Sequence, residues 1–375
     1  MRKLLFVIES LHHGGAEKSL ITLLNTVNLG DFEVDLILFK KGGEFENHLP
    51  KNINVIYKKP IKFSFYSRLT YWIKKKKNKY HTAQSFWKVF KNKITSNSKE
   101  YNIAIAYNQG FSTYYVASKV KAKTKFTWLN TDYINAGYNA NFDKTFYENY
   151  TKIIAVSKES KTSLLKAHGS LKPEIIIVKD IINSINIKEK AIEEKNVLNK
   201  NKNIINILTV GRLAKAKGLH LAIKACQILI KKNKTIKWYI IGEGSERSKL
   251  QNLINSLKLN DNIILMGYKE NPYSYMKTCD IYVQTSLFEG LGLTVIEATI
   301  LNKPIVCTNF PTASSIIKHN ETGLICEMTA KSIANSIIKY IDNPTFVKKV
   351  TANLQNQVNN DTELSLQKIN DLLSQ

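Results

Sequence analysis

Short apolar runs, each followed by a stretch long enough for a helix, recur along almost the whole chain. Continuous apolar strands separated by long crossovers are typical of a parallel sheet that helices cover on both faces. The pattern therefore predicts an α/β fold with doubly wound sheets. The expected strands are Lys3–Ile8, Val34–Phe39, Ile53–Tyr57, Ile103–Tyr107, Lys125–Leu129, Lys152–Val156, Ile175–Val178, Ile204–Val210, Ile236–Ile241, Ile263–Met266, Ile281–Gln284, Pro304–Thr308 and Leu324–Cys326.

The rhythm of strands and helices is interrupted once, by a polar and charged segment. At about 150 residues per domain, 375 residues indicate roughly two domains. We expect a first Rossmann-like domain over residues 1–180, a linker over 181–203, and a second Rossmann-like domain over 204–375 whose last helix packs back on the first. Ligands are expected at the carboxyl ends of the strands and in a cleft between the domains.

Composition sets the compartment and the partners. Apolar residues make up 43% and charged residues 23%, which excludes a disordered or collagen-like chain. The chain opens with a short apolar run that predicts a strand rather than a signal peptide, and no apolar run is long enough to span a membrane. The cysteines are too scattered for a disulfide framework or a metal site and indicate a reducing compartment: Cys226, Cys279, Cys307 and Cys326.

Glycines are scarce, 16 in all, and several follow expected strands. Gly211 follows the run ILTV, and Gly242 and Gly244 follow WYII. Each is explained either by an ordinary strand-to-helix turn or by a close approach of the backbone to a ligand. Arg212 and Lys217 stand beside the first of these turns. Two cations there could bind a diphosphate, although Lys217 could equally be a solvated surface lysine.

The segment FEGLGLTVIEA, residues 288–298, combines a glycine-rich turn with a helix start. Free backbone N–H groups at a helix start attract phosphate. The carboxylates of Glu289 and Glu297 flank the turn, and a carboxylate can accept hydrogen bonds from paired sugar hydroxyls. The coincidence of these features with Arg212 and Lys217 predicts a site for a sugar phosphate.

Taken together, these motifs resemble the donor half of glycosyltransferase family 4 across about residues 205–330. The N-terminal half resembles it more loosely, through Gly14-Gly15-Ala16-Glu17 and the run VSKES at 156–160. The resemblance implies the GT-B architecture, two Rossmann-like domains facing across a cleft, and a retaining reaction that uses a nucleotide sugar.

The resemblance also implies roles for single residues. Arg212 and Lys217 would bind and neutralise the departing diphosphate, which is the main catalytic effect in such a site. Glu297 would bind the ribose and Glu289 the transferred sugar. The remaining donor-binding positions would be Gly211, Gly242, Gly244, Gly267, Tyr268, Gly290, Leu291, Gly292, Leu293 and Thr294.

On the acceptor side, the resemblance implies Gly14, Gly15, Asn130 and Asp132. Asn130 stands where family members often carry a histidine, and an amide cannot take a proton. Front-face attack, with the departing phosphate accepting the proton, would survive this change. His12 and the following His13 are alternative sources of a base, or ordinary loop residues. No Asp-x-Asp occurs, so we expect neither a metal nor a cofactor, with a UDP-sugar as the donor substrate.

Positive charge is concentrated in one segment. The net charge is +25, and between Glu46 and Glu100 fourteen basic residues occur with no acidic residue. Interleaved aromatic side chains suit an amphipathic helix on an anionic membrane surface. A solvated basic face is the alternative, and we expect no nucleic-acid partner because no known module is present. The basic residues are Lys51, Lys58, Lys59, Lys62, Arg68, Lys74, Lys75, Lys76, Lys77, Lys79, Lys88, Lys91, Lys93 and Lys99, and the aromatic residues are Phe63, Phe65, Tyr66, Tyr71, Trp72, Tyr80, Phe86, Trp87 and Phe90.

The sequence thus predicts a retaining, metal-independent glycosyltransferase, cytoplasmic and peripheral on the inner face of the cell membrane. It would act on a lipid-linked saccharide in the synthesis of a cell-envelope polysaccharide or glycolipid. The alternatives are a sugar-nucleotide epimerase, a phosphorylase, or a non-catalytic partner of an active transferase. A Rossmann dehydrogenase fits worst, because the run beginning at Gly242 lacks the third glycine of its fingerprint.

Overall fold

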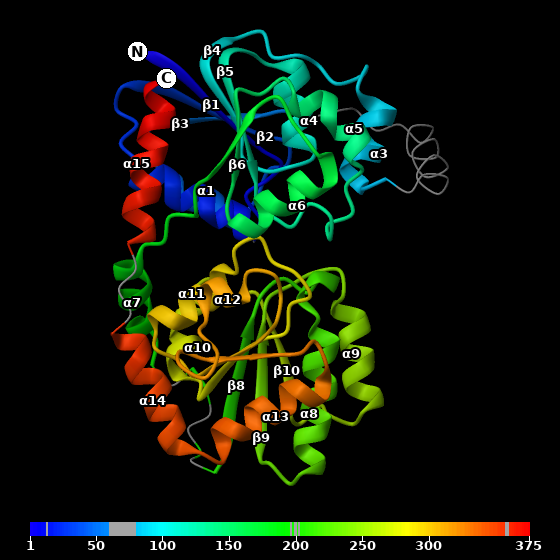
Figure 1. Ribbon diagram of the computed structural model, residues 1–375, viewed down its shortest axis with the longest axis vertical. Helices are drawn as coiled ribbons and strands as arrows, with labels where there is room; N and C mark the ends of the chain where they lie inside the picture. The colour runs from blue at the N-terminus through cyan, green and yellow to red at the C-terminus, as the bar shows by residue number, and fades with distance from the viewer. Residues whose placement is uncertain (13, 60–79, 196, 199–200, 202, 357–359) are drawn as a thin grey trace. The chain divides into compact units, whose positions relative to one another are not determined.

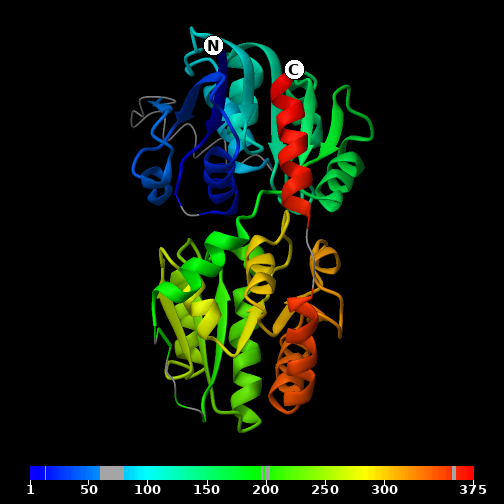
Figure 2. The same ribbon diagram turned by 90° about the vertical axis from the view of Figure 1, so that its left-hand side faces the viewer.

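The structure is a computed structural model that describes residues 1–12, 14–59, 80–195, 197–198, 201, 203–356 and 360–375. The chain forms two compact units, each with its own sheet (Figures 1 and 2). Unit 1 comprises Met1–Ile182 and Asn360–Gln375, and unit 2 comprises Asn183–Asn359.

Unit 1 contains a seven-stranded parallel sheet in the order β3-β2-β1-β4-β5-β6-β7. Its strands are β1 (Arg2–Ile8), β2 (Phe32–Leu38), β3 (Ile53–Tyr57), β4 (Glu100–Ala106), β5 (Lys121–Leu129), β6 (Lys152–Ala155) and β7 (Glu174–Ile177). Its helices are α1 (Gly15–Thr26), the 3₁₀ helix η1 (Glu44–His48), α3 (Thr82–Phe90), α4 (Phe111–Lys119), α5 (Ala140–Tyr147), α6 (Lys158–His168) and α15 (Asp361–Ser374).

Unit 2 contains a six-stranded parallel sheet in the order β10-β9-β8-β11-β12-β13. Its strands are β8 (Ile205–Val210), β9 (Ile236–Ile241), β10 (Ile263–Gly267), β11 (Ile281–Gln284), β12 (Ile305–Thr308) and β13 (Leu324–Cys326). Its helices are α7 (Ser184–Glu193), the 3₁₀ helix η2 (Lys215–Lys217), α8 (Leu219–Lys231), α9 (Arg247–Ser256), α10 (Tyr273–Thr278), α11 (Leu293–Ile300), α12 (Ala313–Ile316), α13 (Ala330–Ile341) and α14 (Pro344–Gln355).

Every strand that the apolar runs predicted is present, and the α/β prediction is confirmed. The strands are continuous apolar runs because helices cover both faces of each sheet: in β11, for example, all four residues are buried. In both units the strand order reverses beside the first strand, between β1 and β4 and between β8 and β11. The carboxyl ends of these two central pairs are the places where a doubly wound sheet binds its ligand.

The segment expected to be a linker contains a helix. Within 181–203, α7 buries Ile187 and Ala191 and contacts α10 and α11 of unit 2. Its Lys190 carbonyl accepts hydrogen bonds from Asn271 Nδ2 at 2.8 Å and Ser274 Oγ at 3.0 Å. These contacts make α7 part of the second unit rather than a free connection.

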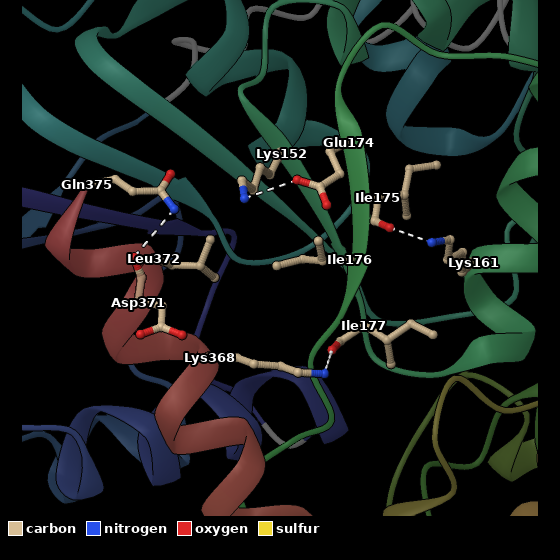
Figure 3. A pocket seen from close by; sticks show the side chains of 10 residues that line it. All are labelled: Lys152, Lys161, Glu174, Ile175, Ile176, Ile177, Lys368, Asp371, Leu372 and Gln375. Carbon is tan, nitrogen blue, oxygen red and sulfur yellow. Dashed lines mark hydrogen bonds and ion pairs between the residues drawn. The ribbon is translucent and has the colours of Figure 1, made fainter.

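The last helix, α15, lies against the edge strand β7 of unit 1. A cavity of about 420 Å³ separates the two elements, and two lysines reach the strand from its flanks (Figure 3). Lys161 Nζ donates to the Ile175 carbonyl at 2.6 Å, and Lys368 Nζ donates to the Ile177 carbonyl at 2.9 Å. The lysines thereby occupy the outward carbonyls of an edge strand, which would otherwise be open to pairing with another chain.

Much of the basic segment lies outside the described residues, including Lys62, Arg68, Lys74, Lys75, Lys76, Lys77 and Lys79. Of its aromatic residues, Phe63, Phe65, Tyr66, Tyr71 and Trp72 also lie outside. In the described part, Trp87 and Phe90 are 1% and 2% exposed and pack in the core with α4. For these two rings the expectation of a membrane-facing role is wrong, because α3 uses them to cover the sheet.

Candidate active site

A lysine and a glutamate meet at the carboxyl edge of unit 2, where its strand order reverses. Lys217 lies in the loop after β8, and Glu289 lies in the loop after the neighbouring strand β11. Lys217 Nζ stands 2.6 Å from Glu289 Oε1. Their side chains are 19% and 12% exposed, so the pair is shielded but still reached by solvent. The structure therefore joins two residues that the motifs predicted to share one site.

Backbone contacts hold the two loops together. Leu287 N donates to the Ala216 carbonyl at 2.7 Å, and Thr285 Oγ1 donates to the Lys217 carbonyl at 2.9 Å. Gly218 lies between them in the left-handed conformation, with φ +57°, and a Cβ there would collide with the Thr285 carbonyl oxygen. The close packing of these loops requires a glycine at this position.

A chain of hydrogen bonds orients Glu289. Ser286 Oγ donates to Glu289 Oε1 at 2.6 Å, and Gln284 Nε2 reaches the same oxygen at 3.2 Å. Gln284 is itself fixed, because Tyr282 OH donates to its Oε1 at 2.9 Å. Both hydrogen bonds to Glu289, and its ion pair with Lys217, involve Glu289 Oε1. Within the described residues Glu289 Oε2 receives no hydrogen bond, which leaves it available to a ligand hydroxyl.

Sequence reasoning missed Tyr282, Gln284 and Ser286. The signal available was a run of polar side chains, Gln284-Thr285-Ser286, ending an otherwise apolar strand, and all three are buried. Buried polar side chains need partners. Gln284 and Ser286 bond to each other and to Glu289, and Thr285 donates to the Lys217 carbonyl. Which partner each would take depends on the placement of the loop after β11, which spacing alone did not give.

Arg212 lies in the same loop as Lys217, and its side chain is exposed. The structure does not pair it with Lys217 or Glu289: among the described residues the Arg212 side chain makes no hydrogen bond or ion pair, and only its backbone carbonyl is used, by Ala214 N at 2.8 Å. Its backbone position is well defined, because Leu213 N donates to the Glu243 carbonyl at 2.9 Å and Glu246 N donates to the Leu213 carbonyl at 2.9 Å. A loop whose backbone is fixed thus carries a cationic side chain that has no partner among the described residues.

The glycines after β9 allow the loop after β9 to pack closely against the loop after β8. Gly242 has φ +140°, and a Cβ there would collide with the Gly211 carbonyl oxygen. Gly244 packs equally closely on Leu213. Gly267, predicted with Tyr268 to bind the donor, ends β10, and its carbonyl accepts the Gly242 N–H at 2.8 Å. These glycines therefore allow a close approach of backbone to backbone, and their expected approach to a ligand stays a prediction.

Helix α11 begins where the glycine-rich turn predicted. Gly292 is its N-cap, with φ +86°, and Leu293 is its first residue. Thr294 in its first turn reaches Gln284 Oε1 at 3.4 Å, and Glu297, one turn further on, is 3% exposed. Gly290 and Leu291, in the preceding turn, are buried. The turn thus lies beside the Glu289 network, and Glu297 is enclosed in the unit.

The acceptor-side predictions fall on unit 1. Gly14 is the N-cap of α1 and Gly15 its first residue, with the Glu17 carboxylate folded back over Gly14. Asn130, directly after β5, donates through Nδ2 to the Tyr107 carbonyl at 2.7 Å. Asp132 is buried. Both its carboxylate oxygens accept hydrogen bonds, from Ser163 Oγ at 2.6 Å, Asn135 N at 3.0 Å and Asn135 Nδ2 at 2.9 Å, which is a role in holding the loop.

The suggested substitutes for the missing histidine are placed as follows. His12 Nδ1 lies 3.2 Å from Glu44 Oε2, and His13 lies outside the described residues. In the part of the chain that is described, no three His, Cys, Asp or Glu side chains gather as a metal site, and metal independence stays a prediction. None of the described helices is long and apolar enough to cross a bilayer.

Two Rossmann-like parallel-sheet units, with a charged site at the strand reversal of the second, define a protein of the GT-B type. The family described as "Glycosyl transferases group 1" matches residues 189–359. Over 336 residues the chain is 30% identical to N-acetylgalactosamine-N,N'-diacetylbacillosaminyl-diphospho-undecaprenol 4-alpha-N-acetylgalactosaminyltransferase of Campylobacter jejuni, covering 88% of this chain and 87% of that protein. The chain belongs to the group 1 glycosyltransferases.

Two further similarities agree with this assignment. An uncharacterized glycosyltransferase of Methanocaldococcus jannaschii is 31% identical over 204 residues, 52% of this chain; the match spans half the length of that relative. Among solved structures, HepE of Anabaena in complex with UDP and glucose superposes with a TM-score of 0.75 at 19% identity, covering 100% of both chains. The latter similarity shows the shared fold.

Proposed function

We propose that the protein is a retaining glycosyltransferase of family 4 that moves a sugar from a UDP-sugar to a lipid-linked saccharide without a metal ion. The observation that carries the proposal is the Lys217–Glu289 pair across the strand reversal of unit 2. It places a cation and a carboxylate with one open oxygen where a doubly wound sheet binds its ligand.

The two residues of this pair would bind different parts of the donor, the lysine its diphosphate and the glutamate its sugar. Lys217 and the exposed Arg212 would bind the diphosphate, whose negative charge grows as the bond to the sugar breaks. Glu289 would accept hydrogen bonds from sugar hydroxyls through Oε2, while the Ser286 and Gln284 bonds hold Oε1 in place. Glu297 would bind the ribose. With two cations on the leaving group, the site needs no divalent metal.

The relatives support the choice of substrates. HepE has been solved with UDP and glucose, which favours uridine in the donor. The Campylobacter protein is named for a diphospho-undecaprenol saccharide, which favours a lipid-linked acceptor. A place on the inner face of the cell membrane, in the synthesis of a cell-envelope polysaccharide or glycolipid, follows from such an acceptor.

The donor proposal is tested by thermal shift with UDP, UDP-glucose, UDP-N-acetylglucosamine and UDP-N-acetylgalactosamine, each with and without EDTA. We expect one of the sugar nucleotides to raise the melting temperature equally in both conditions. Lys217→Ala should abolish the shift, whereas Lys215→Ala, an exposed lysine of the same 3₁₀ helix, should retain it. Stabilisation only in the absence of EDTA, or none at all, would refute the metal-independent UDP-sugar site.

The reaction is tested by product analysis. Incubation with the stabilising donor and an undecaprenyl-diphosphate-linked saccharide should release UDP and give a glycoside with the anomeric configuration of the donor. Inverted configuration would contradict retention. Conversion of the donor to its epimer in the absence of any acceptor would instead establish the epimerase alternative.

A further inference from the structure

The carboxyl edge of unit 1 carries Glu9 and Asn108, two polar residues without an assigned role, close in the sheet to Asn130. Its strand order reverses between β1 and β4, as in unit 2. Val7 of β1 pairs with Ala106 of β4, so Glu9 and Asn108 stand two residues beyond this pair on adjacent strands. Asn130 directly follows β5, the next strand along. The topology therefore brings all three residues to one place at the edge of the sheet.

Two amide oxygens at this edge are buried without a partner. Neither Asn108 Oδ1 nor Asn130 Oδ1 has a hydrogen-bond donor among the described residues. The orientation of Asn130 is fixed, because its Nδ2 donates to the Tyr107 carbonyl at 2.7 Å and its backbone N donates to Gln109 Oε1 at 3.0 Å. A buried oxygen without a donor is unfavourable, and a ligand that supplies one is favoured.

The third acceptor is the half-buried carboxylate of Glu9. The Glu9 carbonyl accepts the N–H groups of Phe39 and Lys40, both at 3.0 Å, which holds its backbone against the end of β2. Its carboxylate makes no hydrogen bond within the described residues. Burial raises the pKa of Glu9, and the exposed Lys40 opposes this rise. The carboxylate is thus withdrawn from water without a donor that compensates for it.

Two aromatic rings lie near the loop that carries Asn108. Burial raises the pKa of Tyr138, and the negative charge of Glu9 adds to the rise. The hydroxyl of Tyr138 lies 3.0 Å from where a Cβ of Gly110 would be. The rings of His81 and Tyr138 stack with their centroids 4.0 Å apart. The loop after β4 therefore places Asn108 near a pair of stacked aromatic rings.

We propose that Glu9, together with Asn108 and Asn130, binds a hydroxyl-rich sugar, the acceptor of the reaction proposed above. The three groups offer acceptor oxygens, so they suit a ligand whose polar groups are hydroxyl donors rather than phosphate oxygens. Glu9 accepts the hydrogen bond of an acceptor hydroxyl and orients it. This assignment adds the carboxylate of Glu9 to the acceptor side, where the resemblance implied Gly14, Gly15, Asn130 and Asp132.

The inference is tested with a panel of n-octyl glycosides of glucose, galactose, N-acetylglucosamine and N-acetylgalactosamine as probes. Binding to the full chain is measured by thermal shift and by saturation-transfer NMR, with the wild type, Glu9→Gln and Glu100→Gln. Glu100 is the matched control, because it lies at the opposite, amino end of the neighbouring strand β4 and its side chain is 72% exposed. UDP binding is measured in parallel on each variant.

We expect at least one glycoside to bind the wild type and Glu100→Gln equally, and its affinity to fall at least tenfold in Glu9→Gln with UDP binding unchanged. Glu9→Asp, which keeps the charge on a shorter side chain, should lose less. Equal glycoside binding by Glu9→Gln, or no glycoside binding by the wild type, would overturn this inference while leaving the donor site intact. Absence of UDP binding to the wild type would instead overturn the proposed function.

Discussion

The two units share one strand order around their central pairs, yet they treat a shielded carboxylate in opposite ways. In unit 2, Glu289 faces a lysine and a chain of fixed hydrogen-bond donors. In unit 1, Asp180 is buried and accepts a hydrogen bond from Ser19 Oγ at 2.5 Å, with Tyr107 rather than a cation on the far side of that hydroxyl. The same topology therefore supports different chemistry, because the loops and not the sheet supply the polar groups.

The largest effect on activity is expected from removing the carboxylate of Glu289, which is paired with Lys217. Glu289→Ala removes Oε2, the open acceptor, and leaves Lys217 without its partner. Loss of one preorganised group in a polar active site typically costs about 10²–10³-fold in rate. We expect donor-dependent transfer to fall by this factor, measured as UDP release in the presence of acceptor. Glu327→Ala, an exposed carboxylate of the same unit, serves as the control and should transfer at the wild-type rate.

In unit 1, Asp180 should instead make the free energy of unfolding depend on pH. Burial raises the pKa of Asp180 to about 6, and the Ser19 hydrogen bond only partly opposes this. A raised pKa in the folded state means that the group's contribution to stability is complete below its unfolded pKa and is lost as pH rises through about 6. The full contribution is about 3 kcal/mol.

The measurement is urea unfolding of wild type and Asp180→Asn between pH 4 and pH 8. The amide is neutral throughout, so the variant should become the more stable of the two as pH rises, with most of the change between pH 4 and 6. The difference between the two proteins cancels titration of other groups. A difference that does not vary with pH would show that Asp180 has the same pKa folded and unfolded.

Two Gly→Ala substitutions distinguish the cost of a positive φ from the cost of a collision between the new Cβ and neighbouring backbone. Gly218→Ala imposes a left-handed alanine and a collision with the Thr285 carbonyl, and we expect a loss of about 2–3 kcal/mol in the free energy of unfolding. Gly137 also has a positive φ, +79°, with nothing near its Cβ position, so Gly137→Ala should cost only about 1–2 kcal/mol. Equal losses, measured by chemical denaturation, would show that the contact between the loops after β8 and β11 adds nothing.

The sequence predicted those features that burial or glycine placement fixes locally, and it missed those that depend on a partner distant in the chain. Burial on both faces of a parallel sheet makes strands readable as apolar runs, so the strands were predicted, while the polar starts of β4 at Glu100 and β5 at Lys121 were missed. Lys217 and Glu289 were predicted as one site because glycines marked their loops. The roles of Gln284 and Asp132 could not be read, because each depends on the spatial position of a partner.

The smallest effect tests whether the hydrogen bonds around Glu289 act through that residue. Ser286→Ala removes the 2.6 Å bond to Oε1 and the acceptor of the Gln284 amide. Hydrogen bonds to charged groups contribute about 1.5–3 kcal/mol, and Lys217 and Gln284 still hold the carboxylate, so we expect about a tenfold fall in kcat. In a Glu289→Ala background the same substitution should change kcat hardly at all, because nothing remains to orient. A tenfold fall in both backgrounds would mean that Ser286 contacts the substrate itself.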